Sequence, residues 1–158
     1  MGGLKALSLH INKFCAFLSG ICIVILTALA LGNMIFRIVY RPIQGSYELI
    51  GFFGAVSVGL ALGYTQMRKD HVIVTILSDK FNLRLRRFLD RISYTGSALF
   101  FVISGWQTFR WGTRLLKTGE LSETLKIIYY PFVYALAFGF FVIAFTLIVD
   151  LLLTLERK

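Results

Sequence analysis

Four long stretches without a charged residue decide what this chain can fold into. They cover residues 14–36, 49–67, 92–109 and 127–149. A hydrocarbon core about 30 Å thick needs about 20 helical residues to cross it, and these stretches hold 23, 19, 18 and 23 residues. Hydrophobic residues make up 57% of the chain and its mean hydropathy is +0.75, which is too apolar for a soluble domain. The sequence therefore predicts an all-α integral membrane protein with four transmembrane helices in one domain, residues 1–158.

The first stretch must be distinguished from a secretory signal. Lys5 and Lys13 precede it, and the segment "ALA" at residues 28–30 imitates a cleavage site. The apolar region of such a signal is about 7 to 15 residues long, which is shorter than 14–36. We therefore expect a first helix that is not cleaved.

Lysine and arginine are distributed unevenly among the connecting segments. If both termini and the loop after the second stretch lie in the cytoplasm, that side holds eleven basic residues and the other side six. This is the asymmetry of the positive-inside rule. It predicts an N-in, C-in multi-pass membrane protein whose basic residues contact phospholipid. Nucleic acid is not an expected partner, because the basic residues sort by loop and not into a stripe on a folded surface.

The loop between the second and third stretches carries a different helical pattern. From residue 78 to residue 91, apolar side chains recur every three or four positions and basic side chains stand between them. This is typical of an amphipathic helix in the membrane interface, and a solvated basic loop is the alternative. The residues expected to hold the chain at the two interfaces are His71, Arg84, Arg86, Arg87, Arg91, Trp106 and Trp111.

Residues able to carry chemistry are few and isolated. His10 and His71 are the only histidines and both lie outside the uncharged stretches, so ligands for a haem or a zinc ion are missing. We expect His71 to be structural or orienting, with a proton relay as the alternative. Cys15 and Cys22 are separated by about 10.5 Å along a helix, too far for a disulfide, and are interpreted as packing residues. We expect no enzyme activity, catalytic residue, cofactor or metal.

The four stretches contain no Asp, Glu, Lys, Arg or His. Transporters and pumps usually carry such groups at membrane depth, because ions and ionised substrates must be matched there. The pattern favours a subunit that supports a function located in another chain.

Small residues recur at every fourth position of the second stretch: Gly51, Ala55, Gly59 and Gly63. Such a row lets another helix backbone approach closely. The row is interpreted either as a packing surface within the chain's own helices or as a contact with another subunit, and both interpretations stay open.

Three segments follow one another in a recognisable order: "YELIGFFGAVSVGLALG", then "RKDHVIVTIL" with the basic "RRFLDRI", then "SETLKIIYYPFVYALAFGF" with Pro131. This order resembles the small, DctQ-like membrane subunit of tripartite ATP-independent periplasmic (TRAP) transporters over about residues 10–155. In that family the second helix runs into a Gly-x-His-Val-x-Val-Asp-like segment. The matching positions here are His71, Val72 and Val74. The departures are Lys69 or Asp70, where glycine is common, and Thr75, where an acidic residue is common.

The resemblance implies a role and not a reaction. It implies a non-catalytic scaffold in a sodium-coupled secondary transporter for organic acid uptake. The implied partners are a large elevator-type membrane subunit, which holds the substrate and sodium sites, and a periplasmic substrate-binding protein. The alternative is a self-contained small four-helix multidrug or ion exporter. Such an exporter needs an intramembrane carboxylate, and the nearest candidates, Glu48 and Asp150, lie at helix ends.

Overall fold

Helices make up most of the described chain. The computed structural model describes residues 2–39, 41–68 and 83–156. Its helices are α1 (Gly2–Val39), α2 (Ser46–Arg68), α4 (Leu83–Thr118) and α5 (Tyr130–Glu156). Between α4 and α5, one isolated β-bridge joins Leu121 to Ile128. No strand occurs within the described ranges, so the predicted all-α class is confirmed there.

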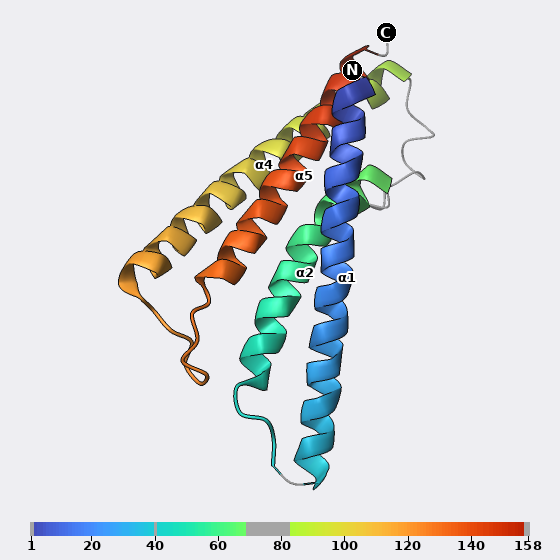
Figure 1. Cartoon of the computed structure of the whole chain (residues 1–158). Helices are drawn as coiled ribbons and strands as arrows, with labels where there is room; N and C mark the ends of the chain where they lie inside the picture. Colours follow the sequence, from blue (N-terminus) through green and yellow to red (C-terminus); the bar gives the residue numbers. More distant parts are fainter. Residues whose placement is uncertain (1, 40, 69–82, 157–158) are drawn as a thin grey trace.

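The helices form two antiparallel hairpins that pack against each other through α2 and α5 (Figure 1). α1 lies along α2 in one hairpin, and α4 lies along α5 in the other. The first turns of α1 and the last turns of α5 lie at the same end of the molecule, which we call the terminal end. The connections 41–45 and 119–129 lie toward the opposite end, which we call the hairpin end.

Among the described residues, three helices are long and apolar enough to cross a membrane: Gly3–Val39, Ser46–Arg68 and Tyr130–Leu153. They contain the predicted spans 14–36 and 49–67 and most of 127–149. The fourth predicted span, 92–109, is helical within α4 but is less apolar. Polar side chains interrupt it at Ser93, Thr95, Ser97, Ser104 and Gln107. The fourth crossing and the N-in, C-in orientation stay predictions.

The start of α4 differs from our expectation. The sequence predicted a separate interfacial helix at 78–91, followed by a turn into the third span. Instead, residues 83–91 and 92–109 belong to one helix that runs from Leu83 to Thr118. The junction from residue 90 to residue 95 contains neither proline nor glycine, so nothing interrupts the backbone hydrogen bonds. Residues 78–82 lie outside the described residues.

α1 packs against α2 and α5 through one narrow seam. The buried residues of α1 are Ser8, Asn12, Cys15, Ser19 and Asn33. Their separations of four, three, four and fourteen residues follow a heptad, which keeps one line of side chains facing its partners. All five are small or polar, whereas most of the large apolar side chains of α1 are exposed.

α4 packs against α5 through a second heptad seam of small residues. Ala98, Gly105 and Gly112 are buried and lie seven residues apart. A Cβ added at Gly105 would lie 3.3 Å from the Cβ of Phe140, and one at Gly112 would lie 3.2 Å from the ring of Tyr134. These small residues bring α4 close to α5, while Phe100, Ile103 and Trp106 of α4 are exposed.

Candidate functional site

A buried polar cluster joins α1 to α5 near the terminal end. Asn12 is 0% exposed and lies between the buried Ser8 and Thr146. Its Nδ2 donates to the backbone carbonyl of Ser8 (2.8 Å), to Ser8 Oγ (3.2 Å) and to Thr146 Oγ1 (2.8 Å). Thr146 Oγ1 donates to the carbonyl of Val142 (2.9 Å). Interhelical hydrogen bonds of this kind fix the register of two membrane helices. We call Ser8, Asn12, Gly63 and Thr146 the terminal joint.

Gly63 of α2 completes the terminal joint. A Cβ at this position would overlap Asn12 Oδ1 and would lie 3.1 Å from Val142 Cγ1. A Cα hydrogen of Gly63 therefore points toward Asn12 Oδ1, which has no conventional hydrogen-bond partner within the described structure. A weak C–H···O contact is the interaction that this geometry offers. Glycine is thus the residue that lets α1, α2 and α5 meet at one point.

One further side-chain pair ties α2 to α5 at the terminal end. Gln66 Nε2 donates to Asp150 Oδ2 over 3.3 Å. Asp150 follows the last uncharged stretch, and Gln66 is buried near the end of α2. The carboxylate of Asp150 therefore contributes to a contact between the two hairpins.

The backbones of α2 and α5 approach each other closely where Gly139 meets Gly59. A Cβ at Gly139 would overlap the backbone of Gly59, and a Cβ at Gly59 would meet Leu136 Cδ1 at 2.7 Å. Beside this crossing, Ser19 Oγ of α1 donates to the carbonyl of Ser57 over 2.8 Å. Close approach of small residues is a main source of helix association in lipid. The crossing therefore holds the two hairpins together at mid-length.

Glu48 connects the two hairpins at the hairpin end. Its Oε1 accepts a hydrogen bond from the backbone N–H of Thr124 (2.6 Å), and its Oε2 accepts one from that of Leu125 (3.2 Å). Hydrogen bonds to a charged acceptor are stronger than neutral ones. One carboxylate at the start of α2 thus holds the connection between α4 and α5. We call Glu48, Thr124 and Leu125 the hairpin joint.

Backbone conformation supports the hairpin joint. Gly45 has φ +73°, and a Cβ there would overlap the side chain of Leu125. Asn33 Oδ1 accepts a hydrogen bond from the N–H of Ile43 (2.9 Å), which fixes the first connection against α1. The turn before α2 therefore presents Glu48 to the second hairpin in one orientation.

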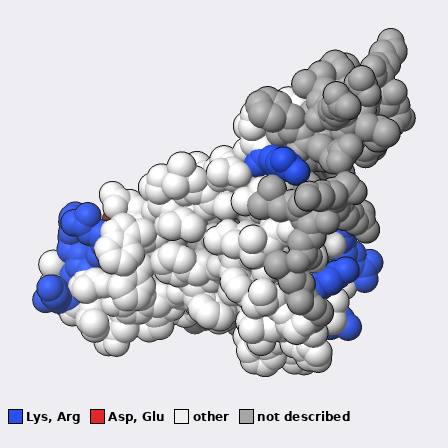
Figure 2. Space-filling model, turned by 90° about the horizontal axis from the view of Figure 1, so that it is seen from above, with Lys and Arg blue, Asp and Glu red and all other residues white. Residues whose placement is uncertain are grey.

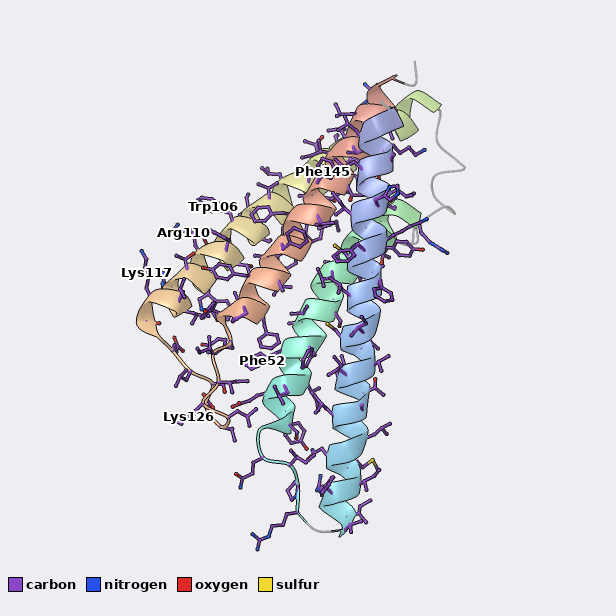
Figure 3. The ribbon with its side chains drawn as sticks, in the orientation of Figure 1. Phe52, Trp106, Arg110, Lys117, Lys126 and Phe145 are labelled. Carbon is purple, nitrogen blue, oxygen red and sulfur yellow. The ribbon has the colours of Figure 1, made fainter. Side chains whose placement is uncertain are left out.

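Stacked aromatic rings extend this contact by one further turn of α2 beyond Glu48. The ring of Phe52 lies 5.6 Å from that of Tyr129 and 5.2 Å from that of Phe132, both in stacked arrangements. Figure 3 shows Phe52 on α2 near the connection that leads into α5. Aromatic pairs of this geometry stabilise a contact beyond the area they bury. The hairpin joint is thus extended along α2 and α5.

The predicted row of small residues divides into two parts. Gly59 and Gly63 are buried at the contacts described above, whereas Gly51 and Ala55 are exposed. The physical reason is the helical pitch: residues four apart advance about 40° beyond one full turn, so the row rotates away from the partner helix. Within the chain, Gly59 and Gly63 contact α5 and α1. A role of this row in subunit contact is not tested and stays a prediction.

All predicted interfacial residues except His71 lie on α4. Trp106 and Trp111 are 57% and 49% exposed, and Arg91 is exposed. Arg84, Arg86 and Arg87 belong to the first turns of α4, and His71 lies outside the described residues. The anchoring role of these residues stays a prediction.

The sequence did not single out Asn12 of the terminal joint or Gly139 at the crossing of α2 and α5. The signal for Asn12 was present, because Ser8, Asn12, Cys15 and Ser19 follow a heptad spacing. Gly139 likewise follows Ala135 by four positions, a small-xxx-small pattern. Among the described residues, no group of three or more His, Cys, Asp or Glu could hold a metal ion.

Comparisons with known proteins connect this architecture to a family. Neither the curated proteins nor the solved structures gave a match. Residues 11–157 match the family described as tripartite ATP-independent periplasmic transporters, DctQ component. The matched range includes both joints apart from Ser8, and it includes all four spans predicted from the sequence. The chain therefore belongs to the DctQ family, the small membrane component of TRAP transporters.

Proposed function

We propose that this chain is the non-catalytic scaffold subunit of a sodium-coupled TRAP transporter for organic acids in the bacterial inner membrane. Its partners are a large elevator-type membrane subunit, which carries substrate and sodium, and a periplasmic substrate-binding protein. The match to the DctQ component family carries this proposal. Sodium coupling, the organic acid and the elevator partner come from the family resemblance.

Polar side chains inside the bundle form hydrogen bonds to neighbouring helices, which supports a scaffold role. Asn12 and Thr146 bond to each other, and Ser19 bonds to the backbone of α2. Such contacts hold helices in register, whereas a transport site presents polar groups to a solute. The four uncharged stretches contain no Asp, Glu, Lys, Arg or His that could match an ion or a carboxylate.

The two joints lie at opposite ends of the contact between the hairpins. Asn12 and Gln66 connect to α5 near the terminal end, and Glu48 holds the second connection near the hairpin end. Hydrogen bonds at both ends of this contact, together with close packing at Gly59, keep the two hairpins from sliding past each other or moving apart. This is the mechanical property that a static support needs beside a moving partner.

The exporter alternative requires a carboxylate that is free to bind its substrate. Glu48 bonds to two backbone N–H groups, and Asp150 accepts a hydrogen bond from Gln66. Both carboxylates thus participate in contacts between the two hairpins. This use favours the scaffold over the exporter.

Purification of a tagged copy from membranes of its native host tests the partnership. We expect a much larger polytopic protein to co-purify in a mild detergent, and a soluble periplasmic protein to associate when substrate is present. Mass spectrometry of the eluate identifies both. Recovery of the chain alone or as a homo-oligomer, with no larger partner after cross-linking in intact cells, would contradict the proposal.

Cysteine labelling tests the proposed orientation. A cysteine introduced at Lys117 should react with an impermeant thiol reagent added from the periplasmic side, whereas one introduced at Arg86 should react only after the membrane is opened. Cys15 and Cys22 are replaced by alanine in both variants. The reverse labelling pattern would overturn the N-in, C-in orientation and leave the subunit assignment standing.

A further inference from the structure

Three basic side chains stand on successive turns of α4 at the hairpin end. Arg110, Arg114 and Lys117 are exposed and are spaced four and three residues apart, which places them on one face of the helix. Figure 3 shows Arg110 and Lys117 in this order along α4, and Figure 2 shows basic side chains gathered at the end of the molecule that α4 occupies. No carboxylate pairs with these three cations in the part of the chain that the structure describes.

The three cations border a hollow of about 430 Å³ on the surface of α4. Trp106 and Phe109 line its apolar part, and Thr113 lies between the apolar part and the cations. On the other side of the two arginines, Gln107 and Trp111 complete a second hollow of about 370 Å³. Arg110 and Arg114 therefore reach open space on both sides.

An apolar groove continues from the first hollow. Phe109 lines both, and the groove of about 340 Å³ is completed by Tyr134, Phe138 and Phe141 of α5. The rings of Phe109 and Tyr134 lie 5.3 Å apart, and Tyr134 Oη donates to Thr113 Oγ1 over 3.2 Å. Thr113 and Tyr134 thus mark the boundary between the basic hollow and the aromatic groove.

The hollow and the groove extend in opposite directions along the membrane normal. Along α5, Phe138 and Phe141 lie about 6 and 10.5 Å beyond Tyr134, deeper in the apolar span Tyr130–Leu153. Along α4, Arg114 and Lys117 lie about 6 and 10.5 Å beyond Arg110, away from the uncharged stretch 92–109. Cations at the membrane surface thus stand above an aromatic groove in the hydrocarbon layer.

We propose that this face holds an anionic phospholipid, with its phosphodiester against Arg110 and Arg114 and one acyl chain along the groove from Phe109 to Phe141. The planar guanidinium groups match phosphate oxygens in pairs, and Lys117 adds charge for a headgroup with net negative charge. The continuous groove favours a lipid over free phosphate, because it offers surface to an acyl chain. The site is independent of the transport function proposed above.

The positive-inside rule does not explain this cluster. In the predicted orientation the rule concentrates cations at the terminal end, whereas these three stand at the hairpin end. A local ligand would account for their position, and within the described residues no carboxylate pairs with them.

The chain's own tryptophans provide the test, because Trp106 and Trp111 are its only two and both line the hollows. The full chain is reconstituted in phosphatidylcholine vesicles. A small fraction of the lipid is phosphatidylglycerol or phosphatidylcholine with brominated acyl chains, which quench tryptophan on contact. We expect phosphatidylglycerol to bind about fivefold or more in preference to phosphatidylcholine, since each basic residue near an anionic lipid contributes about a fivefold change.

The double variant Arg110→Gln with Arg114→Gln should bring this preference close to one. The matched control, Arg37→Gln with Lys126→Gln, removes the same charge from the hairpin end outside the hollows and should keep the preference. Both variants must remain monodisperse and helical. If both double variants lose the preference for phosphatidylglycerol equally, the attraction is a general electrostatic one and the proposed site is wrong.

Two further outcomes would also overturn the lipid assignment. If the unaltered chain shows no lipid preference but binds inorganic phosphate in a manner that needs Arg110 and Arg114, the cations bind free phosphate and no lipid. If the double variant keeps the lipid preference but loses capture of the soluble binding protein by the assembled transporter, the face is a protein-docking surface.

Discussion

α1 and α5 are equally apolar over their most apolar stretches, yet they pack very differently. Only 11% of that stretch is buried within the protein in α1, against 44% in α5. α5 lies between α2 and α4, whereas α1 lies along the outside of the bundle (Figure 1). Hydropathy therefore indicates that both helices belong in the membrane, but it does not indicate which one forms the core.

Small and polar residues explain the difference. α5 presents Gly139 to Gly59 and Thr146 to Asn12, and its neighbours approach it from two sides. α1 is buried only along its heptad seam, where every buried residue is small or polar. Lipid tails are as apolar as leucine, so apolar side chains alone do not drive helices together. The large apolar side chains of α1 outside this seam are mostly exposed.

The largest expected effect comes from breaking the core of α5. Gly139→Leu should destabilise the folded chain by roughly 3 kcal/mol, because the new side chain overlaps the backbone of α2. Gly20→Leu in α1 is the matched control: nothing lies within 4 Å of a Cβ at Gly20, so its effect should stay within about 0.5 kcal/mol. Thermal unfolding in detergent, followed by loss of the monodisperse peak, measures both. Equal destabilisation would refute the difference between the two helices.

A second, smaller effect tests the seam of α1. Asn12→Leu should cost about 1 to 2 kcal/mol, because it removes the hydrogen bond to Thr146 and crowds Gly63. Thr27→Val is the control on the same helix, since Thr27 Oγ1 donates to the carbonyl of Ile23 in α1 and contacts no other helix through that bond. The same unfolding assay measures both variants. A neutral Asn12→Leu would show that the terminal joint contributes nothing.

The hairpin joint should give the smallest and most local effect. In Glu48→Gln the charge is lost and an NH2 donor replaces one acceptor oxygen, so the amides of Thr124 and Leu125 lose their charged acceptor. We expect their hydrogen exchange to accelerate about tenfold with little change in global stability. Glu123→Gln, an exposed carboxylate in the same connection, is the control. Unchanged hydrogen exchange at both amides would show that Glu48 does not hold this connection.

The sequence predicts those features of this structure that depend on residues close together in the chain. Uncharged stretches act over one helix, so they predict α1, α2 and α5, and the seam of α1 is readable as a heptad. The row from Gly51 to Gly63 suggested one continuous surface, but helical rotation buries only half of it. The bond from Glu48 to Thr124 joins residues 76 positions apart, and no local pattern encodes it.

Solute flux tests the scaffold assignment most directly. Liposomes carrying this chain alone should take up none of a panel of radiolabelled organic acids, with or without a sodium gradient, because its spans lack groups that match an ion. Adding the larger membrane subunit and the periplasmic binding protein that co-purify with it should produce sodium-dependent uptake of one acid. Uptake by this chain alone that is lost in Glu48→Gln would contradict the account and establish a self-contained carrier.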